Sequence, residues 1–130
     1  MPDTPPEPVP TDAPPPAQGG PVGDSGEIIL WHVPLSRSMR ILWLLNELEL
    51  PFALRVMDLR SKDMRGAEYE AIHPVGRAPA LRDGDTTIHE SGAMIEYLCE
   101  TRGPHLGRAP GEEGRLGWLD WLHFAETIGQ

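Results

Sequence analysis

The sequence is poor in cysteine, in basic residues and in long apolar runs. Its single cysteine, Cys99, excludes an internal disulfide framework and any Cys-x-x-Cys zinc or redox motif. Eleven Lys and Arg against twenty Asp and Glu leave a net charge of −9, which argues against nucleic acid as the main partner. No apolar run approaches the ~20 residues of a membrane span, and the five histidines show no metal-ligand spacing. We therefore expect a cytoplasmic protein that binds no nucleic acid, membrane or metal.

Proline is abundant but concentrated at one end. Nine of the fifteen prolines fall within residues 1–26, a segment without Lys, Arg or aromatic residues and with four acidic side chains. Such a composition cannot bury enough apolar surface to offset the entropy of ordering. A targeting signal would need basic residues followed by an apolar run. We expect residues 1–26 to be a disordered, acidic, Pro-rich tail.

Hydrophobic periodicity divides the remaining chain into strands and helices. Apolar or alternating runs predict strands at 27–33, 52–60, 78–81 and 86–90, the last two joined by an Asp83–Gly84 turn. Helical spacing predicts helices at 39–50, 61–74 and 91–102, with Ser38 and Ser91 as N-caps. After a Gly/Pro-rich linker at 103–111, a further helix should place Leu116, Leu119, Leu122 and Ala125 on one face. This order favours a mixed sheet with helices packed on it.

Pro79 lies inside the apolar run Ala78–Leu81. Because proline lacks an N–H group, it occurs in sheets only at an edge, at a strand start or at a bulge. With a cis Ala78–Pro79 bond, Ala78 would offer its N–H and C=O groups to an extended peptide ligand. An edge strand with a trans proline and no function is the alternative.

Glu90 and Ser91 stand together where the 91–102 helix begins. A helix N-terminus carries unpaired N–H groups and partial positive charge, which attract carboxylates and phosphates. Glu90 adds a carboxylate suited to an ammonium group. The pair therefore suits the α-amino acid end of a small ligand, with an ordinary N-cap as the alternative interpretation.

Two longer stretches carry a family resemblance. "SRSMRILWLLNELELPF" and "HPVGRAPALRDGDTTIHESGAMIEYL" resemble the N-terminal, thioredoxin-like domain of cytosolic glutathione S-transferases. The resemblance covers about Glu27 to Arg102. It implies an α/β fold, a thioredoxin-like βαβαββα domain with a mixed four-stranded sheet at 27–102. It also implies that 112–130 is the first helix of an all-helical C-terminal domain, which would be truncated here.

The same resemblance implies a ligand and assigns residues to it. Glutathione would be the co-substrate, with a small electrophile as its partner. Pro79 resembles the family's cis-proline, with the main chain of Ala78 pairing with the cysteinyl part of glutathione. Glu90 and Ser91 resemble the pair that holds the γ-glutamyl end. Arg77 stands where many members carry a lysine near the glycine carboxylate, and an arginine keeps the charge with a different geometry.

The catalytic residue should lie in "PLSRSMR", between the first strand and the first helix. Thiolate is the nucleophilic form of glutathione, and a hydroxyl donor beside a helix N-terminus lowers the pKa of the thiol. Ser36, four residues before Arg40, resembles the catalytic serine of a serine-type, theta-like bacterial subgroup. Ser38 is the alternative, and a third possibility is that neither serine acts.

Two functions are compatible with these observations. The first is a glutathione S-transferase that conjugates electrophiles in detoxification and forms a homodimer in its full-length form. The second is a noncatalytic interaction module built on the same fold. If the helical domain is truncated, the apolar faces of 91–101 and 116–125 lose their partners, and we expect self-association.

Overall fold

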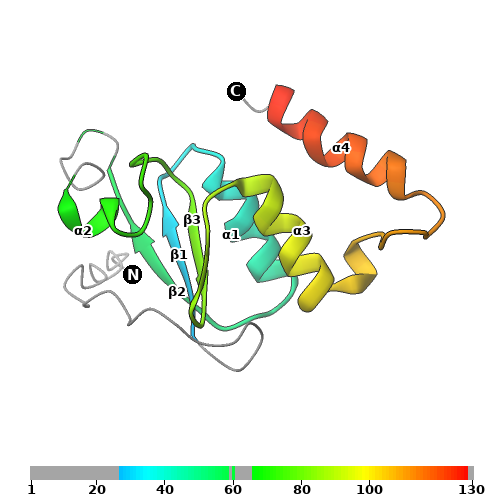
Figure 1. Cartoon of the computed structure of the whole chain (residues 1–130), viewed down its shortest axis with the longest axis horizontal. Coiled ribbons are helices and arrows are strands. Elements are labelled where there is room, and N and C mark those ends of the chain that lie inside the picture. Colours follow the sequence, from blue (N-terminus) through cyan, green and yellow to red (C-terminus); the bar gives the residue numbers. More distant parts are fainter. Residues whose placement is uncertain (1–26, 59, 61–65, 129–130) are drawn as a thin grey trace, which may run out of the picture.

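A four-stranded sheet with helices on both sides forms the body of the molecule, and one further helix follows it (Figure 1). The computed structural model describes residues 27–58, 60 and 66–128. The expected Pro-rich tail, and residues 61–65 of the expected second helix, lie outside these ranges.

The sheet is mixed. Its strands are β1 (Ile28–His32), β2 (Phe52–Val56), β3 (Ala80–Asp83) and β4 (Thr86–Ile88), arranged in the order β2-β1-β3-β4. β1 pairs in parallel with β2 and antiparallel with β3, and β3 pairs antiparallel with β4. This confirms the predicted α/β class and the mixed four-stranded sheet.

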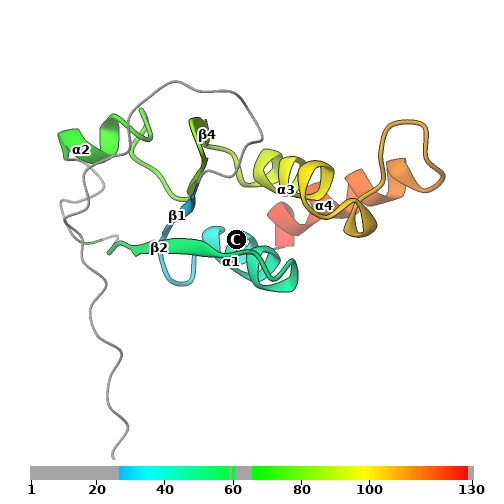
Figure 2. The same cartoon turned by 90° about the horizontal axis from the view of Figure 1, so that it is seen from below.

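The helices bury both faces of the sheet because β1 is apolar on both. Ile28 and Leu30 face a core formed with α1 (Ser38–Glu47) and α3 (Ser91–Thr101). Ile29 and Trp31 face a smaller cluster that includes Tyr69 of the short helix α2 (Ala67–Glu70). Figure 2 shows α2 on the opposite side of the sheet from α1 and α3. The 3-10 turn η2 (Pro104–Leu106) then leads to α4 (Arg115–Ile128).

Several expected boundaries are wrong. β2 ends at Val56 rather than at residue 60, and the described part of the second helix is a single turn. α1 ends at Glu47, since the chain turns at Leu48 and Glu49, the latter with a φ of 52°. β3 begins at Ala80, so Pro79 precedes the strand instead of lying within it, and the missing N–H costs the sheet no hydrogen bond.

Both predicted N-caps are also wrong. The N-cap positions are Arg37 for α1 and Glu90 for α3, and neither makes a side-chain capping bond. Ser38 and Ser91 are instead the first helical residues, and each hydroxyl bonds outside its own helix. Tertiary partners therefore outcompete the local capping bond at both positions.

The predicted apolar face of α4 is partly wrong. Leu122 is buried as expected, but Leu116 is 81% exposed. The docked side of α4 carries Trp118, Leu122 and Glu126, which are spaced four residues apart and so lie on one helical stripe. Leu116 lies two positions before Trp118 and therefore off that stripe.

Candidate functional site

Three segments far apart in the sequence meet at one end of the sheet. Trp31, near the end of β1, pairs with Ala80 at the start of β3, and Leu81 pairs with Ile88 at the end of β4. The loop after β1, the loop before β3 and the residues leading into α3 therefore share this end. All the residues predicted to bind a ligand lie on these segments.

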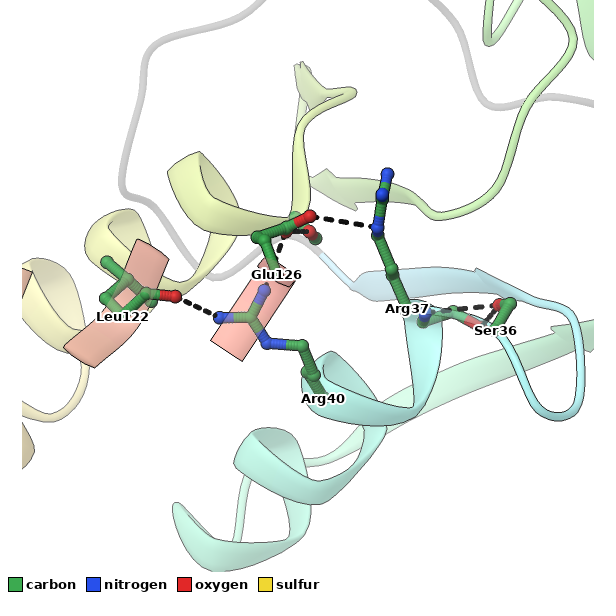
Figure 3. A network of polar contacts seen from close by, with 7 residues as sticks. Ser36, Arg37, Arg40, Leu122 and Glu126 are labelled. Carbon is green, nitrogen blue, oxygen red and sulfur yellow. Dashed lines mark hydrogen bonds and ion pairs between the residues drawn. The ribbon is translucent and has the colours of Figure 1, made fainter. Parts of the chain in front are cut away.

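Ser36 lies in the turn between β1 and α1 (Figure 3). Its backbone N–H donates to the carbonyl of Val33 at 3.2 Å, and its hydroxyl donates to the same carbonyl at 2.7 Å. The Ser36 Oγ also accepts the N–H of Ser38 at 3.2 Å. The hydroxyl is thus half-buried and held just before the N-terminus of α1.

Ser38 is fully buried, with 0% of its surface exposed. Its Oγ accepts the Val33 N–H at 3.0 Å and lies 2.7 Å from His32 Nδ1 and 2.7 Å from Ser36 Oγ. His32 is also buried, and burial lowers the pKa of its imidazole, which favours the neutral ring. The end of β1 and the start of α1 are therefore joined by a chain of three polar side chains.

A second polar network joins the starts of α1 and α3 to α4 (Figure 3). Ser91 Oγ donates to the Glu126 carboxylate at 2.5 Å. Glu126 also pairs with Arg37 at 2.9 Å and with Arg40 at 2.7 Å, and Arg40 donates to the Leu122 carbonyl at 2.9 Å. The first turn of α3 therefore already contacts a carboxylate, supplied by the chain itself, with two guanidinium groups around it.

The loop before β3 contains the predicted cis bond, Ala78–Pro79. Pro79 is buried, Ala78 is half-buried and Arg77 is exposed. The Tyr69 hydroxyl donates to the Arg77 carbonyl, and burial raises the pKa of Tyr69, so the hydroxyl keeps its proton. The short helix α2, on the face of the sheet opposite α1 and α3 (Figure 2), thus holds this loop in position.

Two histidines link this loop to the segment before α3. The rings of His73 and His89 meet edge to face with centroids 5.0 Å apart, and His89 Nε2 lies 2.6 Å from the Ile72 carbonyl. His73 Nδ1 accepts the Val75 N–H at 3.3 Å. Burial first, and then the neighbouring His89, lowers the pKa of His73. Both rings therefore serve as packing and hydrogen-bonding groups between the two predicted ligand-binding segments, and the lowered pKa favours the neutral ring of His73.

Sequence reasoning missed the residues that organise this end of the molecule. His32 carries no motif, and Arg37 and Glu126 are 89 positions apart in the sequence. Glu90, which was predicted, is exposed at the N-cap of α3. The acidic residue in the last helix could have been suspected only from the two arginines at the start of α1, which needed an anionic partner.

The other features of the described chain are weaker candidates for a functional site. A cavity of about 140 Å³ lies between α3, the linker and α4, and Cys99 lines it together with Trp118. Burial raises the pKa of Cys99, which disfavours the reactive thiolate. Within the described ranges, no cluster of three His, Cys, Asp or Glu side chains could hold a metal ion. None of the helices in those ranges is long and apolar enough to cross a bilayer.

Comparisons with known proteins agree on one family. Residues 30–105 match the family model described as "Glutathione S-transferase, N-terminal domain". Glutathione S-transferase 3 of Schizosaccharomyces pombe is 34% identical over 101 residues, 77% of this chain and 41% of that protein. Protein URE2 of Meyerozyma guilliermondii is 37% identical over 76 residues, 56% of this chain and 25% of that protein.

A solved structure adds a bound ligand to this comparison. The glutathione transferase URE2P8 from Phanerochaete chrysosporium, crystallised with oxidised glutathione, is similar with a TM-score of 0.71 and 27% identity. The match covers 78% of this chain and 48% of the transferase. The chain therefore spans about half the length, or less, of the proteins that it matches.

Proposed function

Because this chain belongs to the glutathione S-transferase family through its N-terminal domain, we propose that it binds glutathione and activates the thiol for attack on an electrophile. One observation carries the proposal. The turn containing Ser36, the cis-proline loop and the N-terminus of α3 converge on one end of the sheet. A tripeptide in an extended conformation can contact all three segments at once.

The γ-glutamyl end is assigned to the start of α3. First-turn N–H groups of a helix have no intrahelical acceptor, so the N–H of Ser91 suits the ligand's α-carboxylate. The exposed carboxylate of Glu90 suits the α-ammonium group. Arg37 and Arg40 offset the negative charge of Glu126 beside this position.

The other two parts of glutathione are assigned to the loop before β3. The half-buried main chain of Ala78 pairs with the cysteinyl unit, as the adjacent cis Pro79 turns the chain at this point. The exposed guanidinium of Arg77 attracts the glycine carboxylate.

Ser36 is assigned the role of hydroxyl donor to the sulfur. Its half-buried position just before α1 supports this role, and the complete burial of Ser38 disfavours the alternative serine. In the proposed reaction the thiol proton leaves to solvent. The sulfur electron pair then forms a bond to the electrophilic carbon, and the leaving group departs with its own electron pair. A hydrogen bond from Ser36 stabilises the thiolate before that attack.

The binding part of this proposal can be tested with two peptides. Calorimetry would compare glutathione with cysteinylglycine, which lacks the γ-glutamyl unit. We expect wild type to prefer glutathione, and Glu90→Gln to reduce that preference by about tenfold, the value of one charge-assisted hydrogen bond. Ser91→Ala, which keeps the backbone N–H, should reduce it less. Glu68→Gln, an exposed change on α2, is the matched control. Equal affinity of the wild-type protein for both peptides would refute the γ-glutamyl assignment.

A noncatalytic binding module is the second candidate function, and it is supported by similar proteins whose name contains no transferase activity, such as Protein URE2. The two functions differ in the state of the bound thiol. A transferase lowers the pKa of bound glutathione, and Ser36→Ala removes that effect. A module binds glutathione, or another partner, without such a shift.

The remaining assignments are also proposals. A serine-type, theta-like subgroup rests on the spacing of Ser36 and Arg40. The lone cysteine supports a cytoplasmic location, since disulfides are rare there. A homodimer and a downstream helical domain are supported by exposed apolar side chains on α4, namely Leu116, Trp121, Phe124 and Ile128. Sedimentation at several concentrations would test self-association.

A further inference from the structure

We infer that His32 and Ser38 are positioning residues that direct the single hydroxyl hydrogen of Ser36 toward the glutathione sulfur. The inference rests on the proposed function, because it concerns the same hydroxyl. It follows from counting the donors and acceptors of two serines and one histidine.

Ser38 Oγ has one hydrogen to donate and two lone pairs to accept with. The Val33 N–H, at 3.0 Å, occupies one lone pair. His32 Nδ1 lies 2.7 Å away, and a proton on that nitrogen would occupy the second lone pair. Ser38 could then accept nothing more. Its own hydrogen has two acceptors within hydrogen-bond distance, the Val33 carbonyl at 3.0 Å and Ser36 Oγ at 2.7 Å. Since Ser38 has no lone pair left, only donation from Ser38 to Ser36 places a hydrogen in this shorter contact.

Both lone pairs of Ser36 Oγ are then occupied as well. It accepts the hydroxyl of Ser38 at 2.7 Å and the N–H of Ser38 at 3.2 Å, which uses both of its lone pairs. Ser36 can then only donate. Without ligand its hydrogen goes to the Val33 carbonyl at 2.7 Å. That carbonyl also accepts the Ser36 N–H, so it keeps a donor when the hydroxyl rotates away.

The other neutral form of His32 gives the opposite result. With Nδ1 unprotonated, Ser38 would donate to His32 and would have a lone pair left for Ser36. The hydrogen of Ser36 would then have two acceptors inside the protein, Ser38 Oγ and the Val33 carbonyl, competing with a ligand. The position of one proton on His32 therefore sets whether Ser38 competes with the glutathione sulfur for the hydrogen of Ser36. Burial of His32 and Ser38 strengthens the hydrogen bond between them, because hydrogen bonds are stronger where water is excluded.

The first test determines the protonation of His32 in the wild-type protein. Nitrogen-15 NMR of the full chain with glutathione bound would report which ring nitrogen of His32 carries a proton, with His32→Asn used to assign the signals. We expect a proton on Nδ1. An unprotonated Nδ1 would overturn the inference.

The second test measures the pKa of the bound thiol from the ultraviolet absorption of the thiolate. Ser38→Ala and His32→Leu should each raise that pKa, by up to about one unit, the value of one hydrogen bond. His32→Asn, which keeps an N–H near the Nδ1 position, should restore most of the shift. Binding of S-methylglutathione, which has no thiol, should not change, whereas a merely structural role would weaken it.

The outcomes separate this inference from the proposed function. If Ser36→Ala raises the thiol pKa while Ser38→Ala and His32→Leu leave it unchanged, the positioning role is refuted and the catalytic role of Ser36 stands. If wild type does not lower the thiol pKa at all, the proposed function fails. Should Ser38→Ala fail to fold, the NMR result on the wild-type chain decides the inference.

Discussion

Replacing Glu126 by alanine should release α4 from the rest of the protein. The Glu126 carboxylate connects α4 to three side chains of the domain: Arg37, Arg40 and Ser91. Other polar contacts of α4 include the bond from Arg40 to the Leu122 carbonyl, the 3.7 Å pair between Arg115 and Glu96, and the Trp118 indole bond to the Leu106 carbonyl. The last two lie toward the opposite end of the helix. Glu126 is therefore the main polar attachment of the C-terminal half of α4.

The size of the effect follows from the exposure of each partner. The side chain of Arg37 is 43% exposed, so its ion pair contributes only about 0.5 kcal/mol. The side chains of Arg40 and Glu126 are 21% and 27% exposed, which places that pair near the upper limit for surface pairs, about 1 kcal/mol. The bond from buried Ser91 to a carboxylate adds about 1.5 kcal/mol. Opening of α4 should become easier by about 3 kcal/mol, which is on the order of a hundredfold.

Hydrogen exchange measures this opening directly. In Glu126→Ala, amides of residues 119–128 should exchange on the order of a hundredfold faster, while those of the buried residues of α1 keep their wild-type rates. Arg40→Ala should show a smaller effect in the same segment. The double variant should show less than the sum of the two, because the residues are partners.

Asp120→Ala is the matched control, since Asp120 is an exposed acidic residue on the same helix. Equal exchange in Asp120→Ala and Glu126→Ala would mean that helix propensity, rather than the Glu126 contacts, accounts for the effect. Unchanged exchange in Glu126→Ala would refute the assignment of Glu126 as the attachment of α4.

Two further predictions concern buried ionisable groups. The buried Asp83 carboxylate accepts Arg102 Nη2 at 2.9 and 2.7 Å and the Tyr97 hydroxyl at 2.8 Å. In urea denaturation, Arg102→Met should lower the unfolding free energy by about 3 kcal/mol, and Tyr97→Phe by about 1 kcal/mol; the reverse order would contradict this account. Burial and then His89 lower the pKa of His73 in the folded state, so the unfolded chain takes up its proton first as pH falls. The unfolding free energy should therefore decline as pH drops from about 6.5 toward the lower folded pKa, and it should decline less steeply in His73→Asn. Identical pH dependence in the two proteins would exclude His73 as the cause.

Local sequence signals predicted the elements well where the pattern had a single structural solution. The residues of β1 are apolar on both faces, and both faces can be buried only if the strand lies in the middle of the sheet. The dipeptide Asp83–Gly84 predicted the tight connection between β3 and β4. Boundaries were less predictable. The strand after Pro51 continues to alternate beyond Val56, but pairing ends there because β1 ends at His32, its last partner.

The polar side chains of the site were harder to predict than the elements that carry them. Ser38 and Ser91 both occupy sequence positions typical of N-caps, yet their hydroxyls bond to His32 and Glu126. A hydroxyl bonds to whichever partner the fold brings within hydrogen-bond distance, and propensity does not include that partner. The sequence therefore placed both serines correctly at helix starts, but the predicted capping hydrogen bonds were wrong.

The sequence alone determined the order of the elements, the proline before β3 and the presence of Ser36, Glu90 and Ser91 near strand ends. These features follow from apolar periodicity and from residues with restricted backbones, which act over a few positions. Only the tertiary structure decided which groups meet. Glu126 contacts Ser91 across 35 positions and Arg40 across 86, separations over which a sequence carries no local signal. The difference is physical, because periodicity is a property of neighbours along the chain and a hydrogen bond is a property of neighbours in space.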